Sequence, residues 1–493
     1  MPWVSGDGLV GVSGDDDSAS LPGACRHLGE RNAIQPGFSG VRISRCLVDR
    51  LTDVTDDGEL LSADDARILA LESSVLTGHT LKLMILAPGK PLDLEALRAA
   101  VGRRLGSEPR AVQRVEIGAG APRWVTADGF DIASHVRRRA GGECATPEDL
   151  RRRVSELMSE HLDRSRPLWT LDLIGPLADG SEAIAARMHH AMVDGIAGMR
   201  FLETILLDPH DAPPNHASPN HASPPAAGPT PANTSMSGAN EWVRLPEVIT
   251  RELGQPGSKS PFDRPITAAR DVAFAVAPLD GLRAIGASRP QHATVNDVLL
   301  AAVSGGLDAW LGTHAAHLDL RAQVPVSLHH RDGGASAVGN HDSFINVDLE
   351  LGTSDPLRRL DRISARTRAE KQAGDASLLY DLFHALGAIP GMDAVVHRVA
   401  DSPREFSLAI SNVPGPRVPV AVAGRRVDRL FSSSEPGAHH ALRVAAISHA
   451  DEIGIGFCTD PTAVPRVEAL AEAVGRAYGE LHRAALGETS ARS

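Results

Sequence analysis

The sequence is poor in aromatic residues and in lysine. Phenylalanine, tryptophan and tyrosine together make up 3% of the 493 residues, so the cores must be built from aliphatic side chains. This scarcity also argues against a base-stacking platform for single-stranded nucleic acid. The formal net charge is −12 and no basic stripe offsets it, which argues against a nucleic-acid partner. Lysine occurs only at positions 82, 90, 259 and 371. Because arginine supplies nearly all other positive charges, we interpret this scarcity as a compositional bias and not as the mark of a site.

The sequence also lacks the patterns of a metal centre, a disulfide scaffold or a membrane helix. Its cysteines, Cys25, Cys46, Cys144 and Cys458, are scattered without ligand or redox spacing. The N-terminus does not combine a basic segment with an apolar one, and no window approaches the roughly 20 apolar residues of a spanning helix. We expect a cytoplasmic protein, for which peripheral attachment to the inner face of the plasma membrane stays open.

Composition divides the chain into five segments. Residues 1–58 are rich in Gly and Asp without a sustained period, and Asn-His-Ala-Ser-Pro occurs twice in tandem at 215–219 and 220–224. Segments of this kind cannot bury enough apolar surface to offset their ordering entropy. The predicted division is a flexible extension at 1–58, an N-terminal domain at 59–208, a Pro/Ala/Ser-rich linker at 209–262, a C-terminal domain at 263–485 and a flexible tail at 486–493.

Strand and helix patterns alternate in both halves. Amphipathic helices are expected at 92–105, 147–162, 196–207, 294–311, 354–371 and 464–481, and strands at 81–86, 171–174, 182–188, 272–276, 323–326, 344–351, 406–410, 442–447 and 453–458. Ser62, Thr294 and Ser354 are the expected N-caps of their helices, and Gly312 is an expected C-cap. The alternation predicts an α/β (α+β) class with two layered sheets.

The segment with the clearest chemistry is His189-His190-Ala191-Met192-Val193-Asp194-Gly195. It follows a predicted strand, where a turn can present an imidazole to a cleft. A positioned imidazole can accept the proton of a hydroxyl that attacks a thioester, which contributes about 10²–10⁴ in rate. His190 is therefore the candidate general base. Gly195 is expected to allow a backbone angle that a side chain would resist.

Several other interpretations of this segment remain. A histidine pair beside an apolar helix is commonly structural, and two histidines with one aspartate make up no more than a partial metal site, because no Glu or third His lies at helical spacing. Asp194 can hold the turn through an ion pair with an arginine. The pairs His329-His330 and His439-His440, and His341 after Gly339-Asn340, are not separated from His190 by local pattern alone.

The ensemble of motifs resembles a known family. The segment at 189–195 matches the His-His-x-x-x-Asp-Gly motif of the acyl-CoA-dependent acyltransferase superfamily, which includes chloramphenicol acetyltransferase and peptide-synthetase condensation domains. Further segments resemble the bacterial wax ester synthase/diacylglycerol acyltransferase family in family order. They are Leu-Ser-Ala-Asp-Asp-Ala at 61–66, Trp124, Phe130-Asp131, His135-Val136-Arg137, Pro167-Leu168-Trp169, Thr294-Val295-Asn296-Asp297-Val298, Val-Pro-Val-Ser-Leu at 324–328 with Gly339-Asn340, and Ser-Asn-Val-Pro-Gly-Pro at 411–416.

This resemblance implies a two-domain chloramphenicol-acetyltransferase-like fold with an active-site tunnel between the domains. His190 would deprotonate the acceptor, His189 would support the loop and Asp194 would hold it. Asn296 and Asp297 would shape the site across the cleft, where the Asn296 amide would donate a hydrogen bond to the developing oxyanion. Helix capping is the alternative for both residues. The donor would be acyl-CoA and the acceptor diacylglycerol or a long-chain alcohol, without a cofactor or metal and with a membrane or lipid-droplet surface as a further partner.

Two competing functions and three departures accompany the resemblance. The chain could take acyl groups from a carrier protein, as condensation domains do, or bind lipid without turnover. Thr77-Gly78-His79-Thr80 stands where members commonly carry Pro-Met-His, Phe262-Asp263 where an Asn is common, and His329 where an Arg is usual. These departures bear on substrate preference more than on chemistry.

Overall fold

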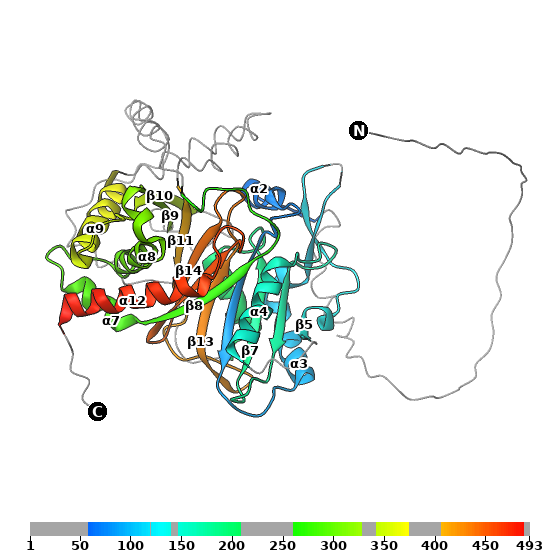
Figure 1. Ribbon diagram of the computed structural model, residues 1–493. Coiled ribbons are helices and arrows are strands. Elements are labelled where there is room, and N and C mark those ends of the chain that lie inside the picture. Colours follow the sequence, from blue (N-terminus) through cyan, green and yellow to red (C-terminus); the bar gives the residue numbers. More distant parts are fainter. Residues whose placement is uncertain are drawn as a thin grey trace, which may run out of the picture. The chain divides into compact units, whose positions relative to one another are not determined.

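The described part of the chain is built around two six-stranded sheets (Figure 1). The computed structural model describes residues 58–118, 120–139, 146–208, 260–327, 342–373 and 406–487, all within the unit Ile43–Ser493. Residues 1–57 of the predicted extension, 209–259 of the predicted linker and 488–493 of the predicted tail lie outside this description, as do His329, His330, Asn340 and His341.

The first sheet has the strand order β12-β13-β2-β7-β6-β5. Its strands are β2 (His79–Leu86), β5 (Val136–Arg138), β6 (Trp169–Ile174), β7 (Glu182–His189), β12 (Ala421–Val422) and β13 (Arg425–Ser434). Within this sheet of the described residues, only β5 and β6 pair in parallel. Helices α3 (Leu94–Arg104) and α5 (Gly195–Ile205) share a core with one face, and α4 (Pro147–Ser159) shares a core with the other.

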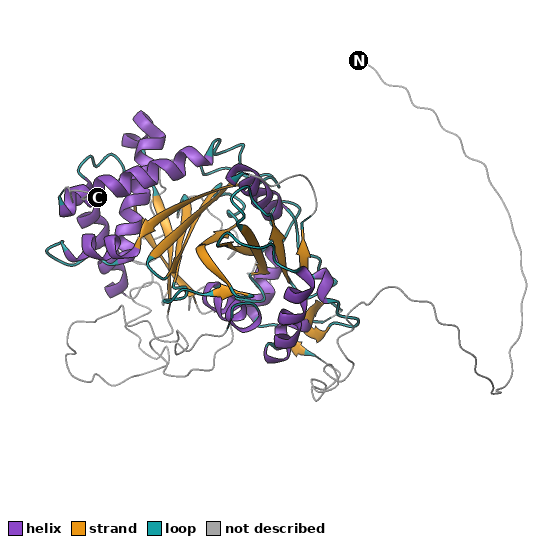
Figure 2. Ribbon diagram, turned by 90° about the horizontal axis from the view of Figure 1, so that it is seen from below, coloured by secondary structure: helices purple, strands orange, loops and turns teal. Residues whose placement is uncertain are grey.

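The second sheet has the order β10-β9-β11-β14-β15-β8. Its strands are β8 (Asp271–Pro278), β9 (Arg321–Ser327), β10 (Asp342–Asp348), β11 (Leu408–Val413), β14 (Leu442–His449) and β15 (Glu452–Thr459). It is mixed, because β11 runs parallel to β9 and β14 whereas the other pairs are antiparallel. Helices α7 (Leu279–Ala287), α8 (Val295–Leu311), α9 (Pro356–Ala373) and α12 (Val467–Leu486) pack into its core, and Figure 2 shows the strands between flanking helices.

A small third sheet lies at the N-terminal edge of the described chain. It consists of β1 (Glu59–Leu60), β4 (Arg123–Thr126) and β3 (Gln113–Glu116), and α2 (Ala63–Leu71) follows β1. Short 3-10 helices occupy Leu105–Ser107, Pro109–Val112, Ile132–Ser134 and Gly312–His317. The mixed, layered architecture confirms the predicted α/β (α+β) class.

Strand β13 joins the two halves of the chain. It comes from the C-terminal half but pairs with β2, with Ser432 opposite Lys82. It also lies against β15, where a Cβ on Gly454 or Gly456 would come within 2.0 Å of the backbone oxygens of Leu430 and Ser432. Only glycine permits so close an approach of two backbones. The C-terminal half therefore completes the N-terminal sheet, and the predicted domain boundaries stay a prediction.

Local signals predict most helix ends correctly. The Ser62 hydroxyl accepts a hydrogen bond from the Asp65 amide at the start of α2, and Thr294 and Asp297 form a capping box at the start of α8, which ends at Gly312 with φ +61°. The prediction that Ser354 caps α9 is wrong. The helix begins two residues later, and Oδ1 of Asp355 accepts the amides of Leu357 and Arg358, because a carboxylate next to the first turn is the stronger acceptor.

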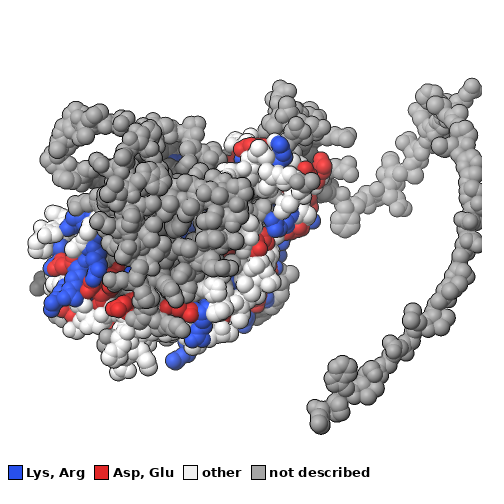
Figure 3. Space-filling view, turned by 90° about the horizontal axis from the view of Figure 1, so that it is seen from above, with Lys and Arg blue, Asp and Glu red and all other residues white. Residues whose placement is uncertain are grey.

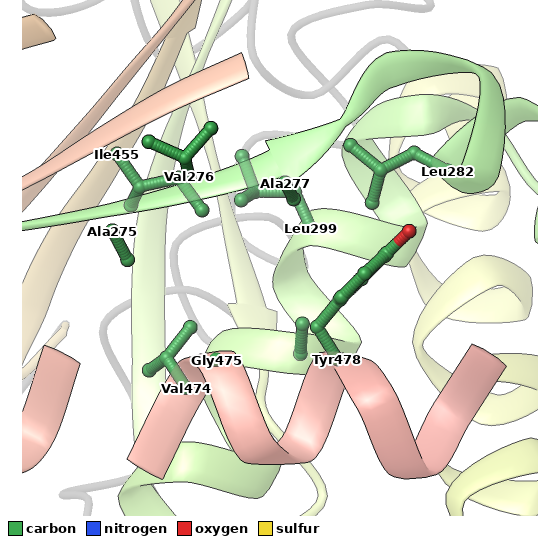
Figure 4. Close-up of a pocket in the computed structure, with 10 residues that line it drawn as sticks. Ala275, Val276, Ala277, Leu282, Leu299, Ile455, Val474, Gly475 and Tyr478 are labelled. Carbon is green, nitrogen blue, oxygen red and sulfur yellow. The ribbon is translucent and has the colours of Figure 1, made fainter. Parts of the chain in front are cut away.

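The second sheet and its helices line a small cavity of about 10 Å³. Figure 4 shows it between β8, β15, α8 and α12, with aliphatic side chains and Tyr478 around it. This volume holds about one water molecule. None of the residues of the histidine motif lines this cavity.

Acidic and basic side chains are interspersed on the described surface. Figure 3 shows Lys and Arg among Asp and Glu on one face. Ion pairs of the described surface include Arg362–Glu350 at 3.1 Å and Arg289–Asp361 at 2.7 Å. Exposed pairs of this kind contribute about 0–1 kcal/mol each. Within the described residues, no helix is both long and apolar enough to cross a membrane.

Candidate active site

The histidine motif forms the turn between β7 and α5. His189 is the last residue of β7 and lies opposite His79 of β2. The His190 amide donates to the Gly78 carbonyl at 2.8 Å, and the amides of Met192 and Val193 donate to the His189 carbonyl at 2.9 and 3.3 Å. These backbone hydrogen bonds hold both imidazoles at the end of the sheet, as the sequence predicts from the strand that precedes them.

The His189 side chain points into the α4 side of the sheet and is buried. Its Nδ1 accepts the amide N–H of Ala191 at 3.1 Å, so the ring proton belongs on Nε2. Nε2 lies 3.5 Å from Oε2 of Glu72. Burial tends to raise the pKa of Glu72, but His189, Arg164 and His161 outweigh it and leave that pKa lowered. The contacts fix the orientation of this ring.

Gly78 makes room for the His189 ring. Its φ is +68°, and a Cβ there would lie 2.1 Å from Nε2 of His189. The position therefore needs glycine for both its backbone conformation and its contact. The contact with His189 explains why glycine stands at the second position of the Thr77-Gly78-His79-Thr80 segment. The backbone N–H groups of Thr77 and Gly78 also donate to the Glu435 carboxylate at 2.7 and 2.5 Å.

His190 occupies the opposite side of the sheet from His189. The residue keeps partial exposure, but its Nε2 is buried. Burial, together with the charges of Arg443, His189 and Lys82, lowers the pKa of His190 to about 3. The imidazole is consequently neutral across the physiological pH range, which is the protonation state that a general base requires.

Asp194 caps helix α5. Its Oδ1 accepts the Ala197 amide at 2.6 Å, and its carbonyl accepts the Gly198 amide at 2.8 Å. Among the described residues it forms no ion pair with an arginine, so helix capping replaces the ion pair that the sequence leaves open. Its charge does raise the pKa of Lys82. The carboxylate therefore holds the turn by satisfying free amides at the helix start.

The expectation for Gly195 is wrong in its reason. Gly195 is the first residue of α5 and does not have a positive φ, so its backbone angle is one that any residue adopts. A Cβ at this position would lie 2.7 Å from Cγ2 of Val413 in β11. Tertiary packing, not backbone conformation, requires the glycine.

Asp297 is a structural residue of α8. It is 3% exposed, accepts the Thr294 amide at 2.8 Å, and accepts the hydroxyls of Ser364 and Thr367 of α9 at 3.2 and 2.6 Å. The capping alternative is thus the one that its contacts support. Asn296 is half-buried in the first turn of the same helix, and its place across the cleft stays a prediction.

The Pro-Leu-Trp segment and the His135 segment build the fold beside the motif. Trp169 is fully buried, and its Nε1 donates to the Ala111 carbonyl at 2.9 Å. Nδ1 of His135 lies 2.8 Å from the Trp169 carbonyl oxygen, and the two rings are 4.6 Å apart. Burial lowers the pKa of His135 to about 4. These contacts make Trp169 a determinant of the fold.

Sequence reasoning misses two cations near His190, of which Lys82 is buried. Lys82 lies in β2 and is 1% exposed. Arg443 lies in β14. The scarcity of lysine indicates only a compositional bias and does not identify Lys82. Both cations lower the pKa of His190. The signal in the sequence that could have identified them is a single lysine or arginine within each of two otherwise apolar strands. Among the described residues, no group of three or more His, Cys, Asp or Glu side chains could hold a metal ion.

The chain matches the models of one family over most of its length. The wax ester synthase/diacylglycerol acyltransferase catalytic domain matches residues 61–299, and the C-terminal domain of the same family matches residues 338–482. The O-acyltransferase WSD of Acinetobacter baylyi is 30% identical over 377 residues, which cover 70% of this chain and 80% of that protein. "Probable diacyglycerol O-acyltransferase tgs1" of Mycobacterium tuberculosis is 28% identical over 415 residues, or 80% of this chain and 89% of that protein.

Solved structures share the fold. The wax ester synthase/diacylglycerol acyltransferase from Marinobacter aquaeolei has a TM-score of 0.64 at 22% identity and covers 87% of this chain and 99% of its own. The first condensation domain of the CDA synthetase has a TM-score of 0.53 at 16% identity, with 87% and 96% covered. These matches confirm the predicted two-domain fold. Because both family models match in chain order, and because a 30% identical relative is covered over 80% of its length, the chain belongs to the wax ester synthase/diacylglycerol acyltransferase family of O-acyltransferases.

Proposed function

We propose that this enzyme transfers a long-chain acyl group from acyl-CoA to the hydroxyl of diacylglycerol or of a long-chain alcohol, with His190 as the general base. The observation that carries the proposal is an imidazole of the family's histidine motif, held at the end of β7 by backbone hydrogen bonds and neutral at physiological pH. The names of the relatives supply the substrate classes, and a tunnel between the halves would admit both substrates.

The proposed reaction is a single displacement at the thioester. His190 takes the hydroxyl proton as the acceptor oxygen bonds to the thioester carbon, and the electron pair of the carbonyl moves onto oxygen. When the carbonyl reforms, the carbon–sulfur bond breaks and the sulfur takes the proton from the imidazolium. Ester and coenzyme A thiol leave. The thioester is already activated, so the proposal includes no cofactor or metal.

The remaining motif residues would position this base. His189 is held by the Ala191 amide and lies beside Glu72, which fixes the turn from the α4 side of the sheet. Asp194 fixes the other end of the turn through the Ala197 amide. A general base contributes only when its geometry is maintained within a fraction of an ångström, so both residues should affect turnover more than substrate affinity.

We also propose that the enzyme meets its acceptor at the surface of a membrane or lipid droplet from the cytoplasmic side. Diacylglycerol and long-chain alcohols partition into such surfaces, so an interfacial encounter is the direct route to the site. Flotation of the purified protein with phosphatidylglycerol vesicles measures this association. A protein that stays entirely in the soluble fraction while it turns over vesicle-borne diacylglycerol would contradict it.

The test of the base assignment compares two histidine variants. Purified wild type, His190→Ala and His314→Ala are supplied with radiolabelled palmitoyl-CoA and either dioleoylglycerol or hexadecanol, and labelled ester is counted. His314 is exposed on the 3-10 helix Gly312–His317 and serves as the control. We expect His190→Ala to lose at least about 100-fold in kcat with unchanged circular dichroism, and the control to match the wild type. Ester formation by His190→Ala at the wild-type rate would refute the assignment.

The same assay separates the donors. Acyl-CoA and the corresponding acyl-carrier protein are offered together with one acceptor, and the loss of each donor is followed. Preferential use of the carrier-bound group would favour the condensation-like alternative. Lipid binding without any ester product would favour the non-catalytic one.

A further inference from the structure

A buried cation lies on the face of the first sheet that carries His190. Side chains alternate along a strand, so Thr80, Lys82 and Met84 of β2 share a face, and the register places Lys82 opposite Ala186 and Thr80 opposite Met188. His190 continues the face of Met188. On the other neighbour of β2, Ser432 of β13 lies opposite Lys82. The Lys82 side chain thus belongs to the same face as the proposed base.

Lys82 has no carboxylate within ion-pairing distance among the described residues. Its ammonium donates to the Ser432 hydroxyl at 2.7 Å, which is a neutral partner. Burial and the charge of Arg443 lower the pKa of Lys82 to about 8, and Asp194 offsets this only in part. At pH 7 such a group is still about nine-tenths protonated. A buried ammonium with a neutral partner is an unfavourable arrangement to maintain for structure alone.

Arg443 presents a second cation, and its Nε donates to no described residue. It lies in β14 between Ala409 of β11 and Cys458 of β15, and its Nε is buried. Glu435 attracts it, but that carboxylate already accepts the amides of Thr77 and Gly78 and lies 3.8 Å from Arg270. The Nε–H of Arg443 is therefore a donor that no described residue accepts.

Neither Lys82 nor Arg443 has a carboxylate within ion-pairing distance among the described residues, although Asp194 and Glu435 attract them from farther away. Cys458 is a neutral thiol because burial raises its pKa to about 12. His190 and His79 are neutral because burial lowers their pKa values. An anion that appears beside the two cations during the reaction would therefore be stabilised.

The chemistry of acyl transfer supplies that anion transiently. Alcohol and thioester are neutral, but negative charge develops on the thioester oxygen during attack and on sulfur during departure. Charges that are in place before the reaction and meet this developing charge lower the barrier without strengthening ground-state binding. Stabilisation by nearby cations matters more when the imidazole is weakly basic, because such an imidazole holds the proton poorly while the negative charge on the oxygen is largest.

We propose that Lys82 and Arg443 are further catalytic residues, whose cationic groups contact the thioester oxygen as it becomes an oxyanion. The inference rests on the proposed reaction, in which His190 accepts the proton. Lys82 is the group nearest to neutral pH, so its deprotonation should remove activity at high pH. The charged groups that bear on this titration are Arg443 from β14 and Asp194 from the turn before α5.

The test follows kcat between about pH 6 and 10 for the wild type, Lys82→Met, Lys82→Arg and Lys90→Met. Lys90 is exposed in the loop after β2 and is the matched control. We expect a basic limb near pH 8 in the wild type and in Lys90→Met. Lys82→Met should lose about 10²–10³-fold in kcat at pH 7, change KM for palmitoyl-CoA less than about threefold and show no basic limb. Lys82→Arg should recover part of the rate and move the limb above pH 9.

Three results would overturn the proposal. The first is a kcat for Lys82→Met within threefold of the wild type, and the second is a basic limb of the pH profile that persists in Lys82→Met. The third is an Arg443→Met variant without a loss of kcat. Each result applies to protein whose thermal unfolding midpoint is at or above the wild-type value. An active His190→Ala variant would instead refute the assignment of His190 as the general base. The basic limb of the pH profile in Lys82→Met would still test the role of Lys82. The two failures are therefore distinguishable.

Discussion

Replacement of Gly195 by alanine would test how the two halves of the chain fit together at the histidine turn. The new Cβ would lie 2.7 Å from Cγ2 of Val413, with Cγ1 and Cβ of Val413 at 3.7 and 3.9 Å. Carbon atoms in contact prefer about 3.5–4.0 Å, so the turn or β11 must move by roughly 1 Å. Such overpacking costs about 1–3 kcal/mol, and the gain in helix propensity offsets at most about 1 kcal/mol of it.

We therefore expect Gly195→Ala to lower the free energy of unfolding by about 1–2 kcal/mol. Because Gly195 follows Asp194 and opens α5, the same movement should displace the turn that carries His190. A displacement of about 1 Å at a catalytic group can cost up to about 100-fold in rate. The loss should fall on kcat more than on KM.

A double-mutant cycle with Val413→Ala isolates the contact. The second substitution removes the methyl groups that the new Cβ meets, so the two changes should couple by about 1–2 kcal/mol and the double variant should recover turnover. Gly198→Ala is the control within the same helix, because its Cβ would meet Val193 and Met188 at ordinary distances of 3.5 and 3.6 Å. Urea unfolding and steady-state kinetics measure all of these proteins. A Gly195→Ala variant as stable as the wild type, or a cycle without coupling, would refute the steric explanation.

Three further outcomes are expected. The kcat/KM of the wild type should be flat from about pH 5 to 7, because His190, whose pKa is lowered to about 3, stays neutral there; a titration near pH 6.5 would contradict this. Burial lowers the pKa of His440 to about 4, so between pH 6.5 and 4 the unfolded state binds a proton that the folded state does not. The free energy of unfolding should therefore fall as the pH falls through that window, by about 2 kcal/mol at pH 5. Urea unfolding of His440→Phe should show a correspondingly smaller loss between pH 7 and 5. Asp297→Ala should cost about 2–4 kcal/mol through its lost cap and hydroxyl partners, read from thermal unfolding; a stable variant with 100-fold lower kcat would instead give Asp297 a role in the site.

Features that depend on neighbouring residues can be predicted from the sequence. The Ser62 cap, the capping box of α8 and the strand before the histidine turn are recognisable because a cap and a two-residue period involve only a few adjacent positions. The misplaced cap of α9 has the same origin: Ser354 and Asp355 are both good caps, and one residue of register separates them.

Strand β13 shows why the rest could not be predicted. Its sequence, RRVDRLFSSS, carries charged residues and a serine run and has no clean alternation. It forms a strand because β2, about 350 residues earlier, offers a partner for Ser432. The core residues Gly454 and Gly456 of β15 are likewise explained only by the close approach of β13.

The sequence by itself determined the family, the layered class and the turn that carries His190, because these depend on motif identity and on short-range patterns. The tertiary structure decided which charges surround that imidazole. Lys82 and Arg443 lower its pKa from strands far apart in the chain, and Gly195 owes its identity to a methyl group of Val413. Electrostatic and steric effects act through space, so their partners appear only when the chain has folded.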